Sequence, residues 1–206
     1  MADLPRGTVA FLFTDIEGST RLWQHHRPAM ERAYARHDAV LRGAIAAEGG
    51  VVYKVIGDAL QVAFPSAERA VAAALEAQLG LDAEDWAGMG LPEPLRVRTV
   101  LHAGAVDPDP DGDYRSPVLN RLGRLLGAGH GGQVLLSQAV QQLARDRMPE
   151  GTELRDLGEH RLKDLLEPER VWQLAHPALD ADFPPPKTLE VVRHNLPVQP
   201  TPVIGR

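Results

Sequence analysis

The sequence predicts an α+β fold with a ferredoxin-like βαββαβ core, extended by further strands and helices on its C-terminal side. Two observations predict this fold. Short apolar, strand-like runs alternate with helical patterns in the order β-α-β-β-α-β between residues 8 and 102, and only a tight turn separates the second run from the third. The chain of 206 residues, 44% hydrophobic and 24% charged, is long and apolar enough for one domain with a remainder.

The first strand is predicted at Thr8–Thr14, where apolar and β-branched residues follow one another. A helix start, Asp15–Thr20, comes next, so the strand ends at a carboxylate. The helical pattern continues from about Thr20 to Glu48. Pro28 divides it, because proline is tolerated in the first turn of a new helix.

The middle of the chain predicts a hairpin, a helix and a fourth strand. Val51–Val55 and Leu60–Phe64 have strand composition and are joined by a four-residue turn. Ser66 then opens an alanine-rich helix that reaches about residue 81. Leu95–His102 alternates apolar and polar residues, as a half-buried strand does.

The rest of the chain is expected to add the last helices and strands of the domain and then to form a linker. The expected elements are a helix at Pro117–Ala128, a strand at Gln133–Leu136, a short helix after Ser137, and strands near Leu154 and at Arg170–Leu174. Beyond these elements the composition becomes rich in proline and irregular. We therefore expect a domain over residues 1–176 and a Pro-rich linker over residues 177–206.

Charge and cysteine content exclude several classes of function. Lys and Arg number 22 against 28 Asp and Glu, so the formal net charge is −6, which argues against bulk nucleic-acid binding. The absence of cysteine excludes disulfides, thiolate zinc sites and thiol nucleophiles.

The start of the chain lacks a signal-peptide pattern and no apolar run is long enough to span a membrane, so we expect a cytoplasmic protein.

Two aspartates are expected to meet although they lie far apart in the sequence. In a βαββαβ core the first strand lies antiparallel to the third, which brings Asp15 beside Asp58. Paired carboxylates favour Mg²⁺ or Mn²⁺, and the turn Ile16, Glu17, Gly18, Ser19 and Thr20 offers backbone amides to phosphate. The alternative is that Asp15 is a helix N-cap and Asp58 an ordinary turn residue.

Other polar residues carry weaker signals. Asn120 and Arg124 lie four residues apart and therefore on one helix face, where they either hold a sugar and a phosphate or form an ordinary exposed surface. The stretch Asp107–Asp113 imitates a calcium loop, but Val118 stands where the glutamate ligand belongs and two prolines interrupt the pattern. We therefore expect a solvated loop there, with Asp113 as its one candidate site residue.

Five segments in order along the chain resemble the catalytic domain of class III nucleotidyl cyclases, the bacterial adenylate cyclases in particular. They are Phe11–Thr20, Lys54–Asp58, Asn120–Arg124, His130–Ser137 and His160–Leu165. The resemblance extends over roughly Gly7–Ala175. The final residues, Asn195–Arg206, resemble the linker that enters the ATPase domain of multidomain cyclase–ATPase regulators, which implies a further C-terminal regulatory domain.

The resemblance implies an adenylate cyclase that converts ATP to cyclic AMP and pyrophosphate with two Mg²⁺ or Mn²⁺ ions. It implies metal binding by Asp15 and Asp58, ribose orientation by Asn120, and transition-state phosphate contact by Arg124. Lys163 matches a lysine that contacts the terminal phosphates. The resemblance also implies a homodimer, in which Asp15 and Asp58 of one protomer face four residues of the other: Lys54, Asp113, Asn120 and Arg124.

Lys54 and Asp113 match the two base-selecting positions of the family. A lysine donor and an aspartate acceptor complement the N1 acceptor and the amino donor of adenine, whereas guanine reverses this pattern. Arg115 and Ser116 depart from the family pattern beside this pocket. Two alternatives therefore stay open: a cyclase for GTP or a pyrimidine nucleotide, and a weakly active nucleotide-binding domain that dimerises as a regulator.

Overall fold

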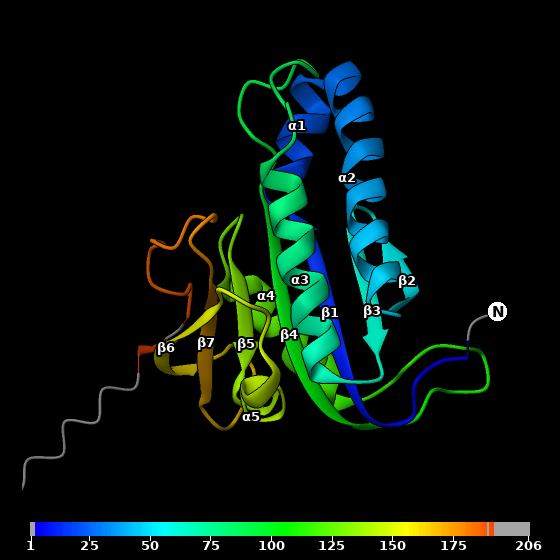
Figure 1. Ribbon diagram of the computed structural model, residues 1–206, viewed down its shortest axis with the longest axis vertical. Coiled ribbons are helices and arrows are strands. Elements are labelled where there is room, and N and C mark those ends of the chain that lie inside the picture. The colour runs from blue at the N-terminus through cyan, green and yellow to red at the C-terminus, as the bar shows by residue number, and fades with distance from the viewer. Residues whose placement is uncertain (1–2, 189, 192–206) are drawn as a thin grey trace, which may run out of the picture.

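An eight-stranded mixed sheet organises the residues that the computed structural model describes, 3–188 and 190–191 (Figure 1). Its strand order is β2-β3-β1-β4-β5-β7-β6-β8. The elements in chain order are β1 (Gly7–Ile16), α1 (Ser19–His25), α2 (Arg27–Ala47), β2 (Val51–Ile56), β3 (Ala59–Phe64), α3 (Ala67–Asp82), β4 (Val97–Val106), α4 (Pro117–Ala128), β5 (Val134–Ser137), α5 (Gln138–Ala144), a 3₁₀ turn (Arg145–Arg147), β6 (Glu153–Arg161), β7 (Glu169–Ala175) and β8 (Glu190–Val191). The predicted α+β fold and its βαββαβ core are confirmed.

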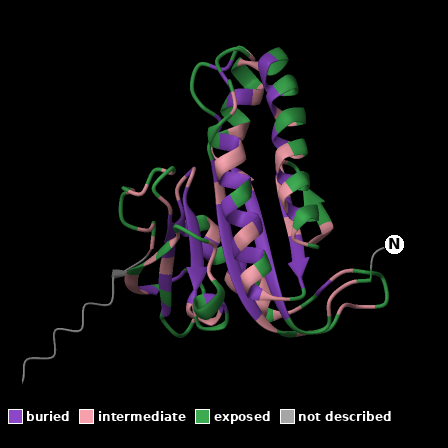
Figure 2. Ribbon diagram, in the orientation of Figure 1, coloured by how far each residue is buried: buried purple, intermediate pink, exposed green. Residues whose placement is uncertain are grey.

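The central strand β1 is buried on both faces of the sheet (Figure 2). Successive side chains of a strand point to opposite faces, and the two hydrophobic clusters follow this alternation. Phe11 and Phe13 pack with α4 on one face, whereas Leu12 and Ile16 pack with α2 and α3 on the other. Because both faces are covered, the sequence of β1 is almost continuously apolar.

The helices divide where the sequence places proline. The predicted helical stretch from Thr20 to Glu48 is two helices that meet at His26, with Pro28 in the first turn of α2. Ser66 does stand at the N-cap of α3, but its hydroxyl makes no capping hydrogen bond. Within the described ranges, no helix is long and apolar enough to cross a membrane.

Strand β4 starts later and ends later than its sequence pattern predicts. It pairs antiparallel with β1 along its whole length, from Ile16 opposite Val97 to Gly7 opposite Val106. The run after His102, Ala-Gly-Ala-Val, has no polar alternation, so pairing with β1 rather than local composition defines the end of the strand.

The β2–β3 hairpin carries Asp58 to the end of β1. Strand β3 pairs antiparallel with β1, and Gln61 lies opposite Phe13. The hairpin turns at Gly57, whose φ of +61° is accessible to glycine without strain. The turn residue Asp58 therefore lies beside the C-terminal end of β1.

Part of the predicted linker contacts the domain. We call residues 176–188 the C-terminal strap. The amide of Lys187 donates to the carbonyl of Ala128 at 2.8 Å, and beyond the strap β8 pairs with β6 as the last strand of the sheet. The predicted boundary at residue 176 stays a prediction, and the proline-rich run at 196–202 lies outside the described residues.

Two glycines give a matched test of packing at the start of the hairpin. A Cβ on Gly50 would lie 2.4 Å from the buried ring of Phe64, whereas a Cβ on Gly43 of α2 meets nothing within 4 Å. We expect Gly50→Ala to lower the free energy of unfolding by about 1–3 kcal/mol through overpacking. We expect Gly43→Ala to raise it by up to about 1 kcal/mol through helix propensity. Urea denaturation measures both, and equal effects would contradict the packing at Phe64.

Candidate active site

The Asp58 carboxylate holds the turn between β1 and α1. Its Oδ2 accepts a hydrogen bond from the amide of Ile16 at 2.8 Å, and its Oδ1 accepts one from the hydroxyl of Ser19 at 3.1 Å. The structure therefore brings Asp58 to the end of β1, where Asp15 lies. The alternative reading of Asp15 as a helix N-cap is wrong, since the N-cap of α1 is Gly18.

The turn presents only part of its backbone to a ligand. The amide of Ile16 binds Asp58, and the amide of Glu17 donates to the carbonyl of Arg96 at 2.9 Å. Gly18 has a φ of +71°, and α1 begins directly after it. The first amides of a helix have no partner inside the helix, so Gly18–Thr20 is the part of the turn that can present amides to an anion.

Asp15 is paired with an arginine that the sequence analysis did not identify. Arg98 of β4 lies directly opposite Asp15 in the antiparallel register and forms an ion pair with it. Burial raises the pKa of the Asp15 carboxyl, Arg98 opposes the rise, and the neighbouring charges of Asp58 and Glu17 add to it. The net pKa lies above the usual value, so burial penalises the ionised form of Asp15 by more than its pairing with Arg98 stabilises it.

The donor set at this end of the sheet suits a hard divalent cation. Asp15 and Asp58 supply carboxylate oxygens, and Mg²⁺ is commonly bound by one or two carboxylates together with substrate phosphates. Among the described residues, no group of three or more His, Asp or Glu side chains is arranged to hold a metal ion by itself. Two carboxylates alone do not make a closed cage, so a cation bound here would need further ligands from outside the described residues.

Lys54 and Asp113 form an ion pair above a cluster of aromatic rings. Lys54 projects from β2, and its ammonium group donates to the Asp113 carboxylate. This hydrogen bond is the main reason that the pKa of Asp113 lies below its usual value. The rings of Tyr53 and Tyr114, each adjacent in sequence to one partner, meet edge to face at 5.0 Å, and Phe11 meets Tyr114 in the same way at 4.9 Å.

Three residues predicted to contact substrate line one open pocket of about 420 Å³. They are Lys54 from β2 and Asn120 and Arg124 from α4. Pro117 occupies the first turn of α4, and the hydroxyl of Ser116 accepts a hydrogen bond from the amide of Val118, which fixes the helix start. Phe13, Gln61, Tyr114, Leu119 and Gly123 complete the lining.

The loop that carries Lys163 meets the same helix. Arg124 forms an ion pair with Asp164 at 2.7 Å, and Asp164 follows Lys163 in the loop between β6 and β7. The side chain of Lys163 is exposed. Lys163 is thus adjacent in sequence to Asp164, the residue that pairs with Arg124.

The predicted site residues fall into two groups with different partners. Asp58 binds the turn at the end of β1, whereas Lys54, four residues earlier, binds Asp113 beside the pocket. The first group offers carboxylates and free backbone amides, and the second offers the Lys54–Asp113 pair beside the pocket that Asn120 and Arg124 line.

Comparison with known proteins decides the family. A family model, that of the adenylate and guanylate cyclase catalytic domain, matches residues 2–175. The chain belongs to this family. It is a class III nucleotide cyclase domain, and cyclases of this class generally use divalent metal ions.

Individual relatives of this cyclase domain differ in how much is known of them. An uncharacterised protein of Mycobacterium tuberculosis is 40% identical over 98% of this chain and 68% of its own length. An adenylate cyclase of Podospora anserina is 27% identical over 85% of this chain and 10% of its own length. A solved structure of adenylate cyclases from Trypanosoma brucei in their monomeric state superposes with a TM-score of 0.77 at 26% identity, covering 89% of this chain and 96% of that one.

The charge balance at Asp15 is open to direct measurement. We expect Arg98→Met to raise the pKa of the Asp15 carboxyl in the metal-free protein, because burial and the charge of Asp58 then act unopposed. Carboxyl-carbon NMR titration measures this pKa. Arg36→Met, which removes the partner of Glu84 elsewhere on the surface, is the control and should leave it unchanged.

The sign of the pH effect follows from the direction of the shift. The folded-state pKa of Asp15 exceeds its unfolded value, so the protonated form favours folding and this contribution is lost as the pH rises through the folded-state pKa. A pKa in Arg98→Met equal to or below that of the parent protein would contradict the described ion pair.

Proposed function

We propose that this cyclase domain converts ATP to 3′,5′-cyclic AMP and pyrophosphate. The observation that carries the choice of ATP is the Lys54–Asp113 pair beside the pocket. It offers one donor and one acceptor, which complement the N1 acceptor and the amino group of adenine. A guanine base would leave both side chains with mismatched partners, at a cost of about 1–3 kcal/mol for each unpaired group.

The reaction is an in-line displacement at the α-phosphorus. The 3′-oxygen of the ribose forms the new P–O bond, the bond to the bridging oxygen of pyrophosphate breaks, and the hydroxyl proton passes to solvent. Asp15 and Asp58 would hold two Mg²⁺ or Mn²⁺ ions. Such ions would supply a lowered pKa at the 3′-hydroxyl and positive charge to neutralise the leaving group.

The remaining residues position the nucleotide and stabilise its charge. Asn120 orients the ribose, and Arg124, one helical turn away, donates to the phosphate oxygens where charge grows in the transition state. Lys163 contacts the terminal phosphates, and the amides of Gly18–Thr20 bind the triphosphate at the start of α1. Most of the rate enhancement comes from positioning and electrostatics, since no covalent intermediate is needed.

We further propose that two copies of the chain complete each site. Asp15 and Asp58 of one protomer would face Lys54, Asp113, Asn120 and Arg124 of the other. Val55 and Ile56, between Lys54 and Asp58 on the edge strand β2, are 47% and 55% exposed. Exposed apolar side chains on an unpaired sheet edge favour burial against a partner, and here they lie between the two groups of site residues.

A competition assay tests the choice of substrate. Purified protein is given equal concentrations of ATP, GTP, CTP and UTP with Mn²⁺, and the cyclic products are separated by chromatography. We expect cyclic AMP to exceed each other product by at least about tenfold, because each mismatched hydrogen-bonding group costs on the order of 1–3 kcal/mol. A dominant cyclic GMP or pyrimidine product would reject the adenine assignment, and no cyclic product at all would favour a binding domain.

Mixed variants test the shared site. Asp58→Asn is expected to reduce cyclic AMP formation by about 100-fold or more, as losing a key electrostatic contact does. Asp38→Asn, which removes a partly exposed carboxylate paired with Arg42, is the matched control and should retain activity. Both proteins should keep the parent circular dichroism spectrum.

Asn120→Ala alone is also expected to be nearly inactive. An equal mixture of Asp58→Asn and Asn120→Ala chains should recover about a quarter of the parent activity, since half of the dimers are mixed and each mixed dimer has one intact site. If heterodimers form and activity does not return, each site lies within one chain and the shared-site proposal is wrong.

A further inference from the structure

Lys187, near the end of the strap, contacts the turn between β1 and α1. The ammonium group of Lys187 lies 3.1 Å from Oε1 of Glu17, the turn residue just before Gly18. The other carboxylate oxygen of Glu17 accepts a hydrogen bond from the amide of Gly131 at 3.1 Å. The amide of Lys187 donates to Ala128 at 2.8 Å, so both the backbone and the side chain of Lys187 are fixed.

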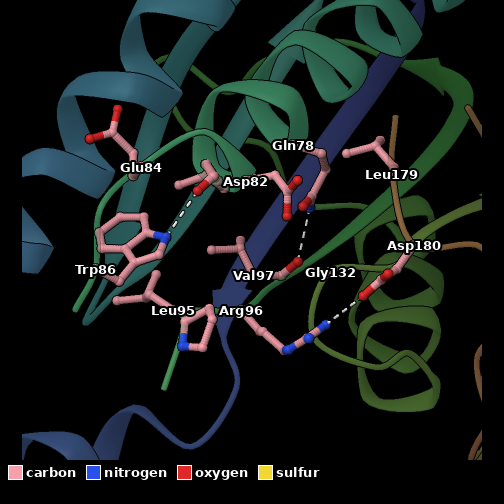
Figure 3. A pocket seen from close by; sticks show the side chains of 12 residues that line it. Gln78, Asp82, Glu84, Trp86, Leu95, Arg96, Val97, Gly132, Leu179 and Asp180 are labelled. Carbon is pink, nitrogen blue, oxygen red and sulfur yellow. Dashed lines mark hydrogen bonds and ion pairs between the residues drawn. The ribbon is translucent and has the colours of Figure 1, made fainter. Parts of the chain in front are cut away.

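The start of the strap contacts Arg96, the residue just before β4, whose carbonyl supports the same turn. Figure 3 shows Leu179 and Asp180 of the strap beside Arg96 and Gly132, around a pocket of about 130 Å³. Asp180 forms an ion pair with Arg96 at 3.2 Å, and the carbonyl of Arg96 accepts the hydrogen bond from the amide of Glu17. The strap therefore contacts the turn in two ways: indirectly through Arg96 and directly through Lys187.

The middle of the strap is held by other contacts. Phe183 stacks on the ring of His130 with the ring centroids 6.5 Å apart and the planes 14° from parallel. The same imidazole contacts the carbonyl of Pro185 at 3.1 Å, and the side chain of Gln173 donates to the carbonyl of Ala181 at 2.8 Å. Because these contacts order the strap, Lys187 loses less conformational freedom when it pairs with Glu17.

The Glu17 side chain is closely surrounded, with one carboxylate oxygen on the ammonium group of Lys187 and the other on the amide of Gly131. A Cβ on Gly131 would lie 2.6 Å from Cβ of Arg96 and 2.8 Å from the Glu17 carboxylate. The backbone at Gly131 therefore approaches Arg96 and Glu17 as closely as glycine allows. The turn is thus held by Asp58 on one side and by Glu17 on the other.

We propose that Lys187 is a positioning residue for the nucleotide site. Through Glu17 it fixes the turn whose amides, Gly18–Thr20, face the triphosphate, so docking of the strap sets the affinity for metal–ATP. This inference rests on the proposed function for the role of the turn. The family match ends at residue 175, so the strap contributes this contact from outside the matched cyclase domain.

Lys187→Ala tests the contact in the full chain. Both side chains of the pair are partly exposed, at 48% for Lys187 and 39% for Glu17, so the melting temperature should change little. We expect faster hydrogen–deuterium exchange at the amides of residues 17–22 and an increase of about three- to fivefold in the KM for ATP, with a smaller change in kcat. Lys187→Arg should restore both values, because it keeps the cation.

Two further variants separate positioning from strap stability. Arg155→Ala removes contacts to the carbonyl of Ala181 and to Asp182 without touching the turn, and should leave the KM and the exchange at residues 17–22 unchanged. Glu17→Gln combined with Lys187→Ala should raise the KM no further than either change alone, since both remove one interaction. Additive effects, equal effects of Arg155→Ala and Lys187→Ala, or unchanged exchange in Lys187→Ala would each overturn the proposal.

A binding measurement distinguishes failure of the Lys187 proposal from failure of the proposed cyclase function. Affinity for an ATP analogue with a methylene group between its α and β phosphates, which cannot be cyclised, is measured by calorimetry with Mn²⁺. If the parent protein makes no cyclic nucleotide, the proposed function fails. The exchange and analogue-binding results then decide alone: weaker binding in Lys187→Ala with parent-like binding in Arg155→Ala supports the role of Lys187, and equal binding rejects it.

Discussion

The hydrogen bonds of the Asp58 carboxylate are the constraint on which the rest of the candidate site depends. The amide of Ile16 lies at the end of a buried strand, where an unpaired amide is costly, and Asp58 satisfies it from 42 positions further along the chain. This contact fixes the β2–β3 hairpin against the end of β1. The same carboxylate is therefore both a structural partner of the turn and a candidate metal ligand, so its position is set before any ligand binds.

A second constraint orders the pocket. Phe11, Tyr53 and Tyr114 come from three separate segments and pack their rings edge to face, which fixes β2 and the loop before α4 relative to β1. Lys54 and Asp113 are the neighbours of two of these rings. The packing of the three rings thus determines where the Lys54–Asp113 ion pair lies. The ion pair itself need not stabilise the fold.

The sequence predicted those parts of the molecule that depend on local patterns. The apolar run of β1, the proline before α2 and the hairpin composition all have strong local signals, and the convergence of Asp15 with Asp58 follows from strand order alone. Arg98 was missed because its importance depends on the β1–β4 register, which places it opposite Asp15. The contacts of Lys187 were missed for a similar reason: a proline-rich composition indicates a linker, and nothing local shows that the segment folds back.

The pairing of Arg98 with Asp15 has a consequence for how the site fills. A guanidinium that already neutralises one carboxylate competes with any incoming cation for it, so the empty site attracts metal ions less strongly than two free carboxylates would. In the proposed ATP-bound site, the triphosphate would bring negative charge for the guanidinium to contact instead. Release of Asp15 would then coincide with arrival of the nucleotide, and cation and nucleotide would enter cooperatively because one arginine would serve as counter-charge to each anion in turn.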